Sequence, residues 1–307
     1  MLAVLEAFAV IAIIIAVGAV VGRTNVLGDN ARMVLNRVAF HVGVPALVLL
    51  SLADSTPSQV FSPPVVVSIV TTLLIFAGSF AFAVTLRGQD RADATISAWA
   101  ASWVNAGNLG IPLSAYVLGS ITEVSALIVF QTVVLVPVGV AIVNSARHVG
   151  GSALAQIKGL VTNPIIAASA VGMVLGLTGV TLPRAIHQPL ELLADLAIPT
   201  VLLAFGIALV SRPPARGRES RLDLVVVVLV KVLLMPVLAF VLARWAFGLS
   251  PDQVAVATVL AALPAAQNLN TYAAVFERGE KLARDATLIT TLASVPVIAA
   301  IAYLLGL

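Results

Sequence analysis

Residues 102–113 read Ser-Trp-Val-Asn-Ala-Gly-Asn-Leu-Gly-Ile-Pro-Leu, a polar and glycine-rich stretch inside a long apolar segment. Proline within a helix removes a backbone donor and clashes with the preceding turn, and glycine lowers helix stability further. A second stretch, residues 263–270, reads Leu-Pro-Ala-Ala-Gln-Asn-Leu-Asn. Backbone groups released from helical pairing inside a membrane must face protein or a wet cavity. The two stretches therefore predict two helices that break at Pro112 and Pro264 and cross near the middle of a membrane.

The composition is that of an integral membrane protein. Of the 307 residues 60% are apolar, and only 17 Lys and Arg and 14 Asp and Glu carry charge. A soluble domain is about 45–50% apolar and about 25% charged, so this chain has too little polar surface to cover a water-exposed globule. The sequence contains no cysteine, which excludes disulfides and thiolate chemistry. The net charge of +3 is too small to indicate a nucleic-acid partner.

A membrane-spanning helix needs about 20 mostly apolar residues, and the chain contains ten such segments. The first has no positively charged region before it, so it is interpreted as a span rather than a cleaved signal peptide. The connections are short, and none is long enough for a separate soluble domain. The predicted fold is all-α, with spans at about residues 2–22, 31–52, 64–86, 93–118, 122–145, 159–178, 185–210, 223–247, 253–276 and 286–306.

The distribution of Lys and Arg predicts the orientation in the cell membrane. With the N-terminus outside, 13 of these residues fall in inner connections and 2 on the outer side. Cytoplasmic connections are enriched in Lys and Arg, so this asymmetry supports ten spans with both termini outside.

Proline-centred patterns recur in the same order in both halves of the chain, at offsets of 154, 152 and 159 residues. They predict a first repeat of five spans at 1–148, a short cytoplasmic linker at 149–158 and a second repeat at 159–307. Because five is odd, the second repeat must be inverted, an arrangement common in secondary transporters. The matched prolines are Pro45 with Pro199, Pro112 with Pro264, and Pro137 with Pro296.

The crossing of spans 4 and 9 is the predicted binding site. Broken helices would present two half-helix N-termini, whose free N–H groups and dipoles favour an anion. Side-chain amides there add donors without the cost of a buried charge. The alternative is a pair of kinked helices whose amides only join helices together.

The segments Leu35–Pro45, Asn105–Leu113 and Leu263–Leu307 together resemble the auxin efflux carrier family, with the Asn…Gly-Ile-Pro segment as the most specific part. That family includes the plant PIN carriers and bacterial carriers assigned to carboxylates such as malonate and malate. The resemblance implies a ten-helix fold like that of the bile acid symporters and NhaA, a carboxylate bound where spans 4 and 9 cross, and a homodimer. It also implies that Asn105 and Gln131 line the substrate pocket. The long cytosolic loop of many plant members is missing here.

The predicted function is a secondary transporter that moves a small organic anion, malonate-like or auxin-like, by elevator-type or rocking alternating access. A sodium-coupled symporter of the bile acid type is the alternative, and a channel would need a polar stripe that the spans lack. No hydrolase or metalloprotease motif and no P-loop occurs, so neither an enzyme nor an ATP-driven pump is predicted. No cofactor or metal site is predicted. The candidate binding residues are Asn105, Asn108, Gly110, Ile111, Gln131, Gln267 and Asn268.

Ionisable residues within the spans are candidates for coupling, because they are costly in a membrane. His41 and Asp195 occupy equivalent positions of the two repeats and could couple transport to protons or gate the moving part. The alternative is a structural hydrogen bond between packed helices. Arg37 is a second gating candidate, although it could also snorkel to lipid phosphates, as could Lys231. Proton and sodium coupling both remain open at this stage.

Overall fold

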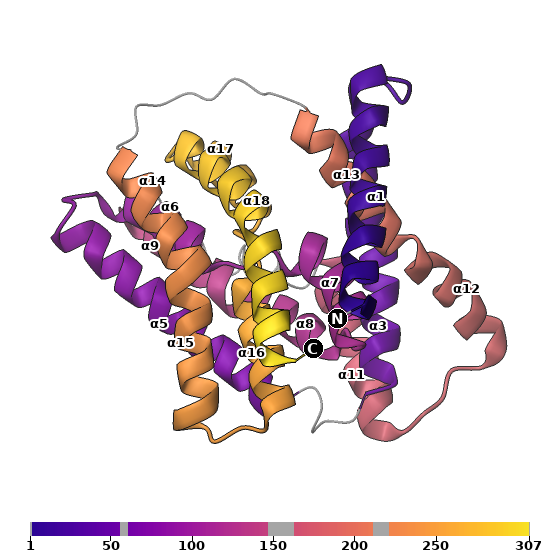
Figure 1. Cartoon of the computed structure of the whole chain (residues 1–307). Helices are drawn as coiled ribbons and strands as arrows, with labels where there is room; N and C mark the ends of the chain where they lie inside the picture. The colour runs from indigo at the N-terminus through magenta and orange to yellow at the C-terminus, as the bar shows by residue number, and fades with distance from the viewer. Residues whose placement is uncertain (1, 56–60, 147–162, 211–220, 307) are drawn as a thin grey trace. The chain divides into compact units, whose positions relative to one another are not determined.

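The computed structural model describes residues 2–55, 61–146, 163–210 and 221–306, and these residues form helices joined by short connections (Figure 1). Six helices in this part of the chain are long and apolar enough to cross a membrane, and three shorter apolar helices accompany them. The chain is therefore an all-helical integral membrane protein, as predicted. The six are Ala31–Ala53, Pro63–Thr85, Thr122–Ala146, Arg184–Val210, Arg221–Ala246 and Glu280–Leu305, and the shorter ones are Ala9–Thr24, Ala106–Leu118 and Pro164–Thr178.

Several of these helices consist of α-helical pieces joined by five-residue π-helical segments. Four of these segments end two residues before a proline, at Pro45, Pro112, Pro137 and Pro236. A proline ring clashes with the carbonyl four residues earlier, and a wider π turn relieves that clash. The helices therefore continue through these prolines instead of breaking. The π segments are η1 (Ala39–Gly43), η2 (Ala106–Gly110), η3 (Ser114–Leu118), η4 (Gln131–Leu135), η5 (Val230–Leu234) and η6 (Leu242–Ala246).

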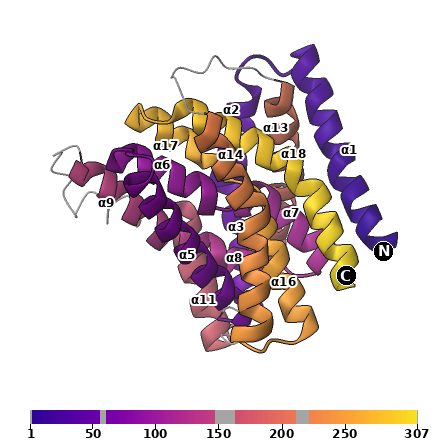
Figure 2. The same cartoon turned by 60° about the vertical axis from the view of Figure 1, so that its left-hand side comes forward.

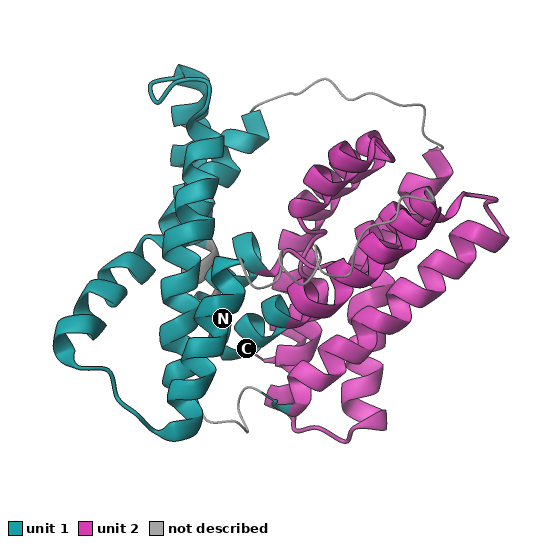
Figure 3. Cartoon of the chain, turned by 180° about the vertical axis from the view of Figure 1, so that it is seen from behind, with its two compact units in different colours: residues 1–62, 107–129, 157–213 teal, residues 63–106, 130–156, 214–307 magenta. Residues whose placement is uncertain are grey.

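The chain divides into two compact units, and each unit takes segments from both halves of the sequence (Figure 3). Unit 1 comprises Met1–Ser62, Gly107–Val129 and Ile157–Pro213, and unit 2 comprises Pro63–Ala106, Phe130–Gln156 and Pro214–Leu307. The helices of unit 1 are α1 (Leu2–Thr24), α2 (Ala31–Val38), α3 (Val44–Ala53), α7 (Ile111–Leu113), most of α8 (Thr122–Phe130), α11 (Pro164–Thr178), α12 (Arg184–Asp195) and α13 (Ala197–Val210). Those of unit 2 are α5 (Pro63–Thr85), α6 (Arg91–Ser102), α9 (Val136–Ala146), α14 (Arg221–Leu229), α15 (Met235–Val241), α16 (Pro251–Ala262), α17 (Asn268–Phe276) and α18 (Glu280–Leu305).

Unit 1 is built on close helix pairs, α1 with α13 and α3 with α11. Glycines lie at both contacts. A Cβ at Gly206 would clash with the carbonyl oxygen of Ile15, and a Cβ at Gly172 would clash with that of Leu49. Small residues allow helix backbones in membranes to approach closely, so packing of this kind stabilises the unit without a water-driven hydrophobic effect.

Unit 2 surrounds the short helix α6, which is buried along nearly its whole length. Helices α5, α9, α14, α17 and α18 pack against α6, and α16 packs against α5, α15 and α18 (Figure 2). Asp90 caps α6 by accepting hydrogen bonds from the N–H groups of Ala92 and Asp93, at 2.8 and 2.9 Å. The helix therefore begins at a defined residue and directs its other end, at Ser102, into the interior of the unit.

The predicted linker at 149–158 lies outside the described residues. So do five of the basic residues on which the predicted orientation depends: Arg147, Lys158, Arg212, Arg216 and Arg218.

Candidate functional site

Two interrupted helices of unit 2 meet through their backbones, in what we term the crossover (residues 103–106 and 263–266). Helix α6 ends at Ser102 and α16 ends at Ala262. Beyond these ends the chain is extended, and Val104 and Ala265 form an isolated antiparallel bridge. The N–H of Asn105 donates to the carbonyl of Pro264 at 2.8 Å, and the N–H of Ala266 donates to that of Trp103 at 2.9 Å. Each interruption thus supplies hydrogen-bond partners for backbone groups of the other that have no partner in their own helix. The interior of a membrane protein requires such pairing.

The break in the first of these helices lies before Pro112, not at it. Pro264 lies within the second interruption, whereas Pro112 follows the π segment η2 and occupies the first turn of α7. The π segment relieves the clash of the Pro112 ring, which explains why the helix continues through this residue.

Polar side chains of α18 support the crossover. The buried hydroxyl oxygen of Thr290 accepts a hydrogen bond from the N–H of Ala265 at 3.1 Å. The amide of Asn270 in α17 donates to the hydroxyl of Thr287 at 3.4 Å. Sequence reasoning missed this support, although a signal was present: Thr287, Thr290, Thr291 and Ser294 have the spacing of one helix face and are all buried.

An aromatic cluster lies beside the crossover. The ring of Trp99 on α6 and that of Trp103, which directly follows α6, each lie within 6 Å of the ring of Tyr272 on α17, with centroid distances of 5.4 and 5.7 Å. The indole N–H of Trp99 donates to the carbonyl of Leu135 at 3.3 Å, and Gly139 on α9 leaves room for the ring. Trp99 therefore fixes the position of α6 against η4 and α9.

The predicted amides differ in burial. Asn105 and Gln131 are buried, with exposed fractions of 4% and 3%, and Nε2 of Gln131 has no hydrogen-bond partner among the described residues. Gln267 is half-buried, and Asn268 is exposed at the first position of α17. These four belong to unit 2. The remaining predicted residues belong to unit 1, where Asn108 is half-buried and Gly110 and Ile111 are buried.

Helix ends of both signs lie at the crossover. The C-termini of α6 and α16 place carbonyl ends there, whereas α17 begins at Asn268 and directs the positive end of its dipole toward the same region. An anion is favoured at the α17 end, and the side-chain amides supply hydrogen-bond donors without a fixed charge. This arrangement suits a ligand that combines a carboxylate with other acceptors.

The three predicted coupling residues lie in unit 1 and are exposed. His41 uses Nδ1 in a contact of 3.1 Å with the carbonyl oxygen of Arg37, and Asp195 is the last residue of α12. Lys231 in unit 2 is different. The prediction that it snorkels to the membrane surface is wrong, because its side chain is fully buried and Nζ lies 3.0 Å from Sδ of Met235.

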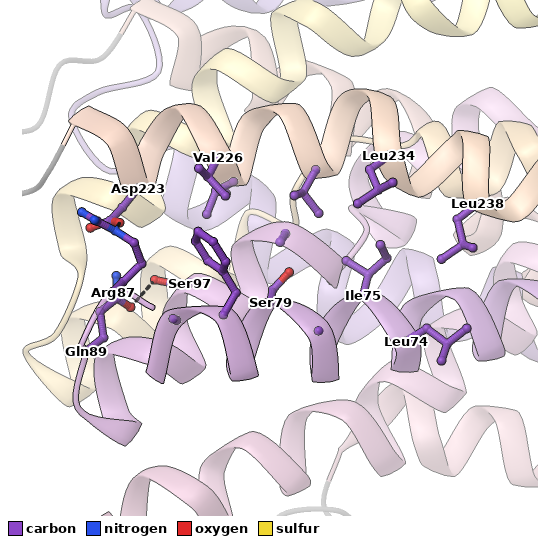
Figure 4. A pocket seen from close by; sticks show the side chains of 16 residues that line it. Leu74, Ile75, Ser79, Arg87, Gln89, Ser97, Asp223, Val226, Leu234 and Leu238 are labelled. Carbon is purple, nitrogen blue, oxygen red and sulfur yellow. Dashed lines mark hydrogen bonds and ion pairs between the residues drawn. The ribbon is translucent and has the colours of Figure 1, made fainter. Parts of the chain in front are cut away.

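A cavity of about 440 Å³ lies elsewhere in unit 2, between α5, α6 and α14–α15 (Figure 4). Most of its lining is apolar, as at Leu74 and Leu234. Its polar end holds the ion pair between Nε of Arg87 and Oδ1 of Asp223, at 2.6 Å, and a hydrogen bond from Ser97 to Gln89, at 2.9 Å. None of the predicted binding residues lines this cavity.

A family model described as "Membrane transport protein" matches residues 3–151 and 147–302, which is nearly the whole chain. The chain belongs to this family of membrane transporters. The match confirms the resemblance to the auxin efflux carrier family.

Relatives agree with this family of transporters. The chain is 27% identical over 282 residues to a Rhizobium meliloti protein named "Putative malonate transporter", covering 88% of this chain and 86% of that protein. It is 29% identical over 233 residues to an "Uncharacterized transporter" of Methanothermobacter thermautotrophicus, covering 74% of each chain. It is 21% identical over 265 residues to the "Uncharacterized transporter YfdV" of Escherichia coli K12, covering 83% of each. The protein is therefore a membrane transporter and not an enzyme.

Proposed function

We propose that this protein is a secondary transporter for a small organic anion of the carboxylate class, which binds at the crossover. The observation that carries the proposal is the pair of interrupted helices whose extended segments hydrogen-bond to each other beside buried amides. Broken helices of this kind form substrate sites in transporters with inverted repeats. The relative named as a malonate transporter supports the choice of carboxylate.

In this proposal Asn105, Gln131, Gln267 and Asn268 bind the anion. Segments η4 and α9 belong to one helix, Thr122–Ala146, and α9 is its later part. Helix α6 packs along α9, so the earlier residues of α6 lie beside the later residues of Thr122–Ala146. The two helices are therefore antiparallel. Trp99 contacts Leu135. Trp103 lies four residues after Trp99, directly beyond the end of α6, and is then about level with Gln131, which lies four residues before Leu135 on η4. This register supports a position for the buried Gln131 amide beside Asn105.

The proposed fold comprises ten membrane spans in two inverted repeats, at 1–148 and 159–307, with both termini outside the cell membrane and a homodimer as the assembled form. The proposed mechanism is alternating access of the elevator type. It is supported by the division of the chain into two compact units, of which unit 2 contains the crossover. Unit 2 would carry the anion, and unit 1 would act as the scaffold.

The test is a thermal-shift titration of the purified, detergent-solubilised protein with malonate and with its diamide. A ligand that binds only the folded state at about 100 times its Kd adds about 2.7 kcal/mol of stability. Malonate is expected to raise the unfolding temperature and the uncharged diamide is not. Including sodium in a parallel series tests the sodium-coupled alternative.

Two variants test the position of the site. Asn105→Ala removes an amide at the crossover and is expected to abolish the malonate shift. Asn144→Ala, the matched control, removes an amide on α9 about 20 Å further along the helix from Gln131 and is expected to keep the shift. Equal loss of the shift in both variants, or an equal response to the diamide, would contradict the proposal.

A further inference from the structure

Lys231 is a basic side chain in the interior of unit 2, and no counter-ion lies beside it among the described residues. Its side chain is fully buried, and Nζ contacts Sδ of Met235, which is a weak acceptor. In the part of the chain that the structure describes, no carboxylate forms an ion pair with it. A charged amine in such a site is strongly unfavourable unless an anion compensates it. The amine in this site is therefore expected to hold a proton only when an anion lies near it.

The helices packed against η5, the segment that holds Lys231, are α6, α14, α15, α16 and α18. Their ionisable groups lie near the ends of the helices, and several are already paired, as Asp223 is with Arg87 and Asp285 with Arg284. On α14, Asp223 precedes Lys231 by eight residues, or about 12 Å of helix. These groups are Arg91 and Asp93 of α6, Arg221 and Asp223 of α14, Asp252 of α16, and Glu280, Lys281, Arg284, Asp285 and Tyr303 of α18.

Helix α18 contacts both the segment that holds Lys231 and the crossover. It holds the crossover through the hydrogen bond from the N–H of Ala265 to Thr290, and it also packs against α14 and η5. Helices α14 and α18 run in the same direction (Figures 1 and 2). Lys231 and Thr290 each lie ten residues beyond the first residue of their helix, Arg221 and Glu280. The amine and the proposed anion site thus lie within unit 2 on segments that pack against the same helix.

We propose that the amine of Lys231 binds the proton that is transported together with the carboxylate. The inference rests on the proposed function. The amine takes up a proton when the anion enters unit 2, because the anion compensates the new charge, and it releases the proton on the other side when the anion leaves. Adjacent helix axes lie about 8–10 Å apart. Two opposite unit charges about 12 Å apart, at an effective dielectric constant of about 20, attract each other strongly enough to change the affinity for the anion about tenfold. The same coupling makes malonate bind more tightly to the protonated protein.

The experiment uses the full chain in proteoliposomes, with radiolabelled malonate, a trapped pH-sensitive dye and the membrane potential held at zero. The exterior is at about pH 7 and the interior at about pH 8, so that malonate remains ionised on both sides. One proton per malonate predicts about tenfold accumulation for one pH unit. The wild type and Leu233→Met, an exposed neighbour that serves as the matched control, are both expected to reach this value.

Lys231→Met is expected to exchange malonate across the membrane without accumulating it, so that the concentration ratio falls from about ten to about one. Lys231→Gln provides a second variant if the first does not fold, as judged by its thermal unfolding. Asp195→Asn is expected to accumulate malonate as the wild type does. This result would show that proton coupling depends on Lys231 and not on Asp195, the carboxylate among the coupling candidates of unit 1.

Retained accumulation in a folded Lys231 variant would overturn this inference and leave the proposed function intact. Wild-type malonate uptake that does not respond to the pH gradient would do the same. No wild-type uptake or exchange of malonate would overturn the proposed function for this anion, and the pairing with Lys231 would fall with it.

Discussion

The hydrogen bond between the crossover and α18 can be tested with Thr290→Val. Valine is close to threonine in shape, so the substitution removes the hydroxyl without opening a cavity. The N–H of Ala265, which donates to Thr290 at 3.1 Å in a fully buried site, then loses its acceptor. A buried donor left without an acceptor costs about 1–3 kcal/mol. The expected result is a destabilised unit 2 with a less well-fixed crossover.

Thr291→Val is the matched control, because Thr291 is the next residue of the same helix and is also buried. Its hydroxyl donates to the carbonyl of Thr287 at 2.7 Å, as that of Thr290 does to Ala286, so each variant loses one short bond of this kind. The hydroxyl of Thr290 also has a longer contact, of 3.4 Å, with the carbonyl of Thr287. Among the described residues no donor forms a hydrogen bond to the hydroxyl oxygen of Thr291. The two variants therefore differ mainly by the cost of the unpaired Ala265 N–H.

The assay is thermal unfolding in detergent, followed by intrinsic fluorescence. At about 2–4 °C per kcal/mol, Thr290→Val is expected to unfold about 2–12 °C below Thr291→Val. Its affinity for malonate is also expected to be lower than that of the control. If the two variants unfold at the same temperature, the hydroxyl of Thr290 does not hold the crossover and the reasoning fails.

Two further predictions concern the packing of unit 2. Gly139→Ala places a Cβ against the indole of Trp99 and is expected to destabilise the protein by about 1–3 kcal/mol. Gly78→Ala is the control, because Gly78 lies in a helix with open space around it, and this variant is expected to be neutral or slightly stabilising. Thermal unfolding of both variants checks this prediction. Asp223→Asn removes the carboxylate that pairs with the largely buried guanidinium of Arg87 and is expected to lower the free energy of unfolding by about 1–3 kcal/mol. Adding Arg87→Met to the same chain is expected to restore part of this loss. A double-mutant cycle measures the coupling between the two residues.

Much of the helical architecture could be predicted from the sequence, because apolar length alone decides where a chain can cross a membrane. The position of the break in the first crossing helix could not. Pro112 has the sequence signal of a break, but a π segment absorbs its ring, and the extended residues begin at Trp103. What decides the break is the partner strand at Ala265, 161 residues away from Val104 in the chain. Periodicity within one helix contains no information about such a pairing.

The direction of the Lys231 side chain could not be predicted from the sequence either. A lysine in an apolar span is equally consistent with an amine that reaches the membrane surface and with one that turns inward, because the four-carbon chain can follow either direction. The structure turns it inward, beside the helix whose threonines support the crossover. The amides at the crossover supply donors but no charge, so a positive charge that balances an anion in unit 2 must come from outside that cluster. A buried amine on a segment that packs against α18 supplies a positive charge when it is protonated, and its removal should therefore abolish coupling while leaving exchange of the anion intact.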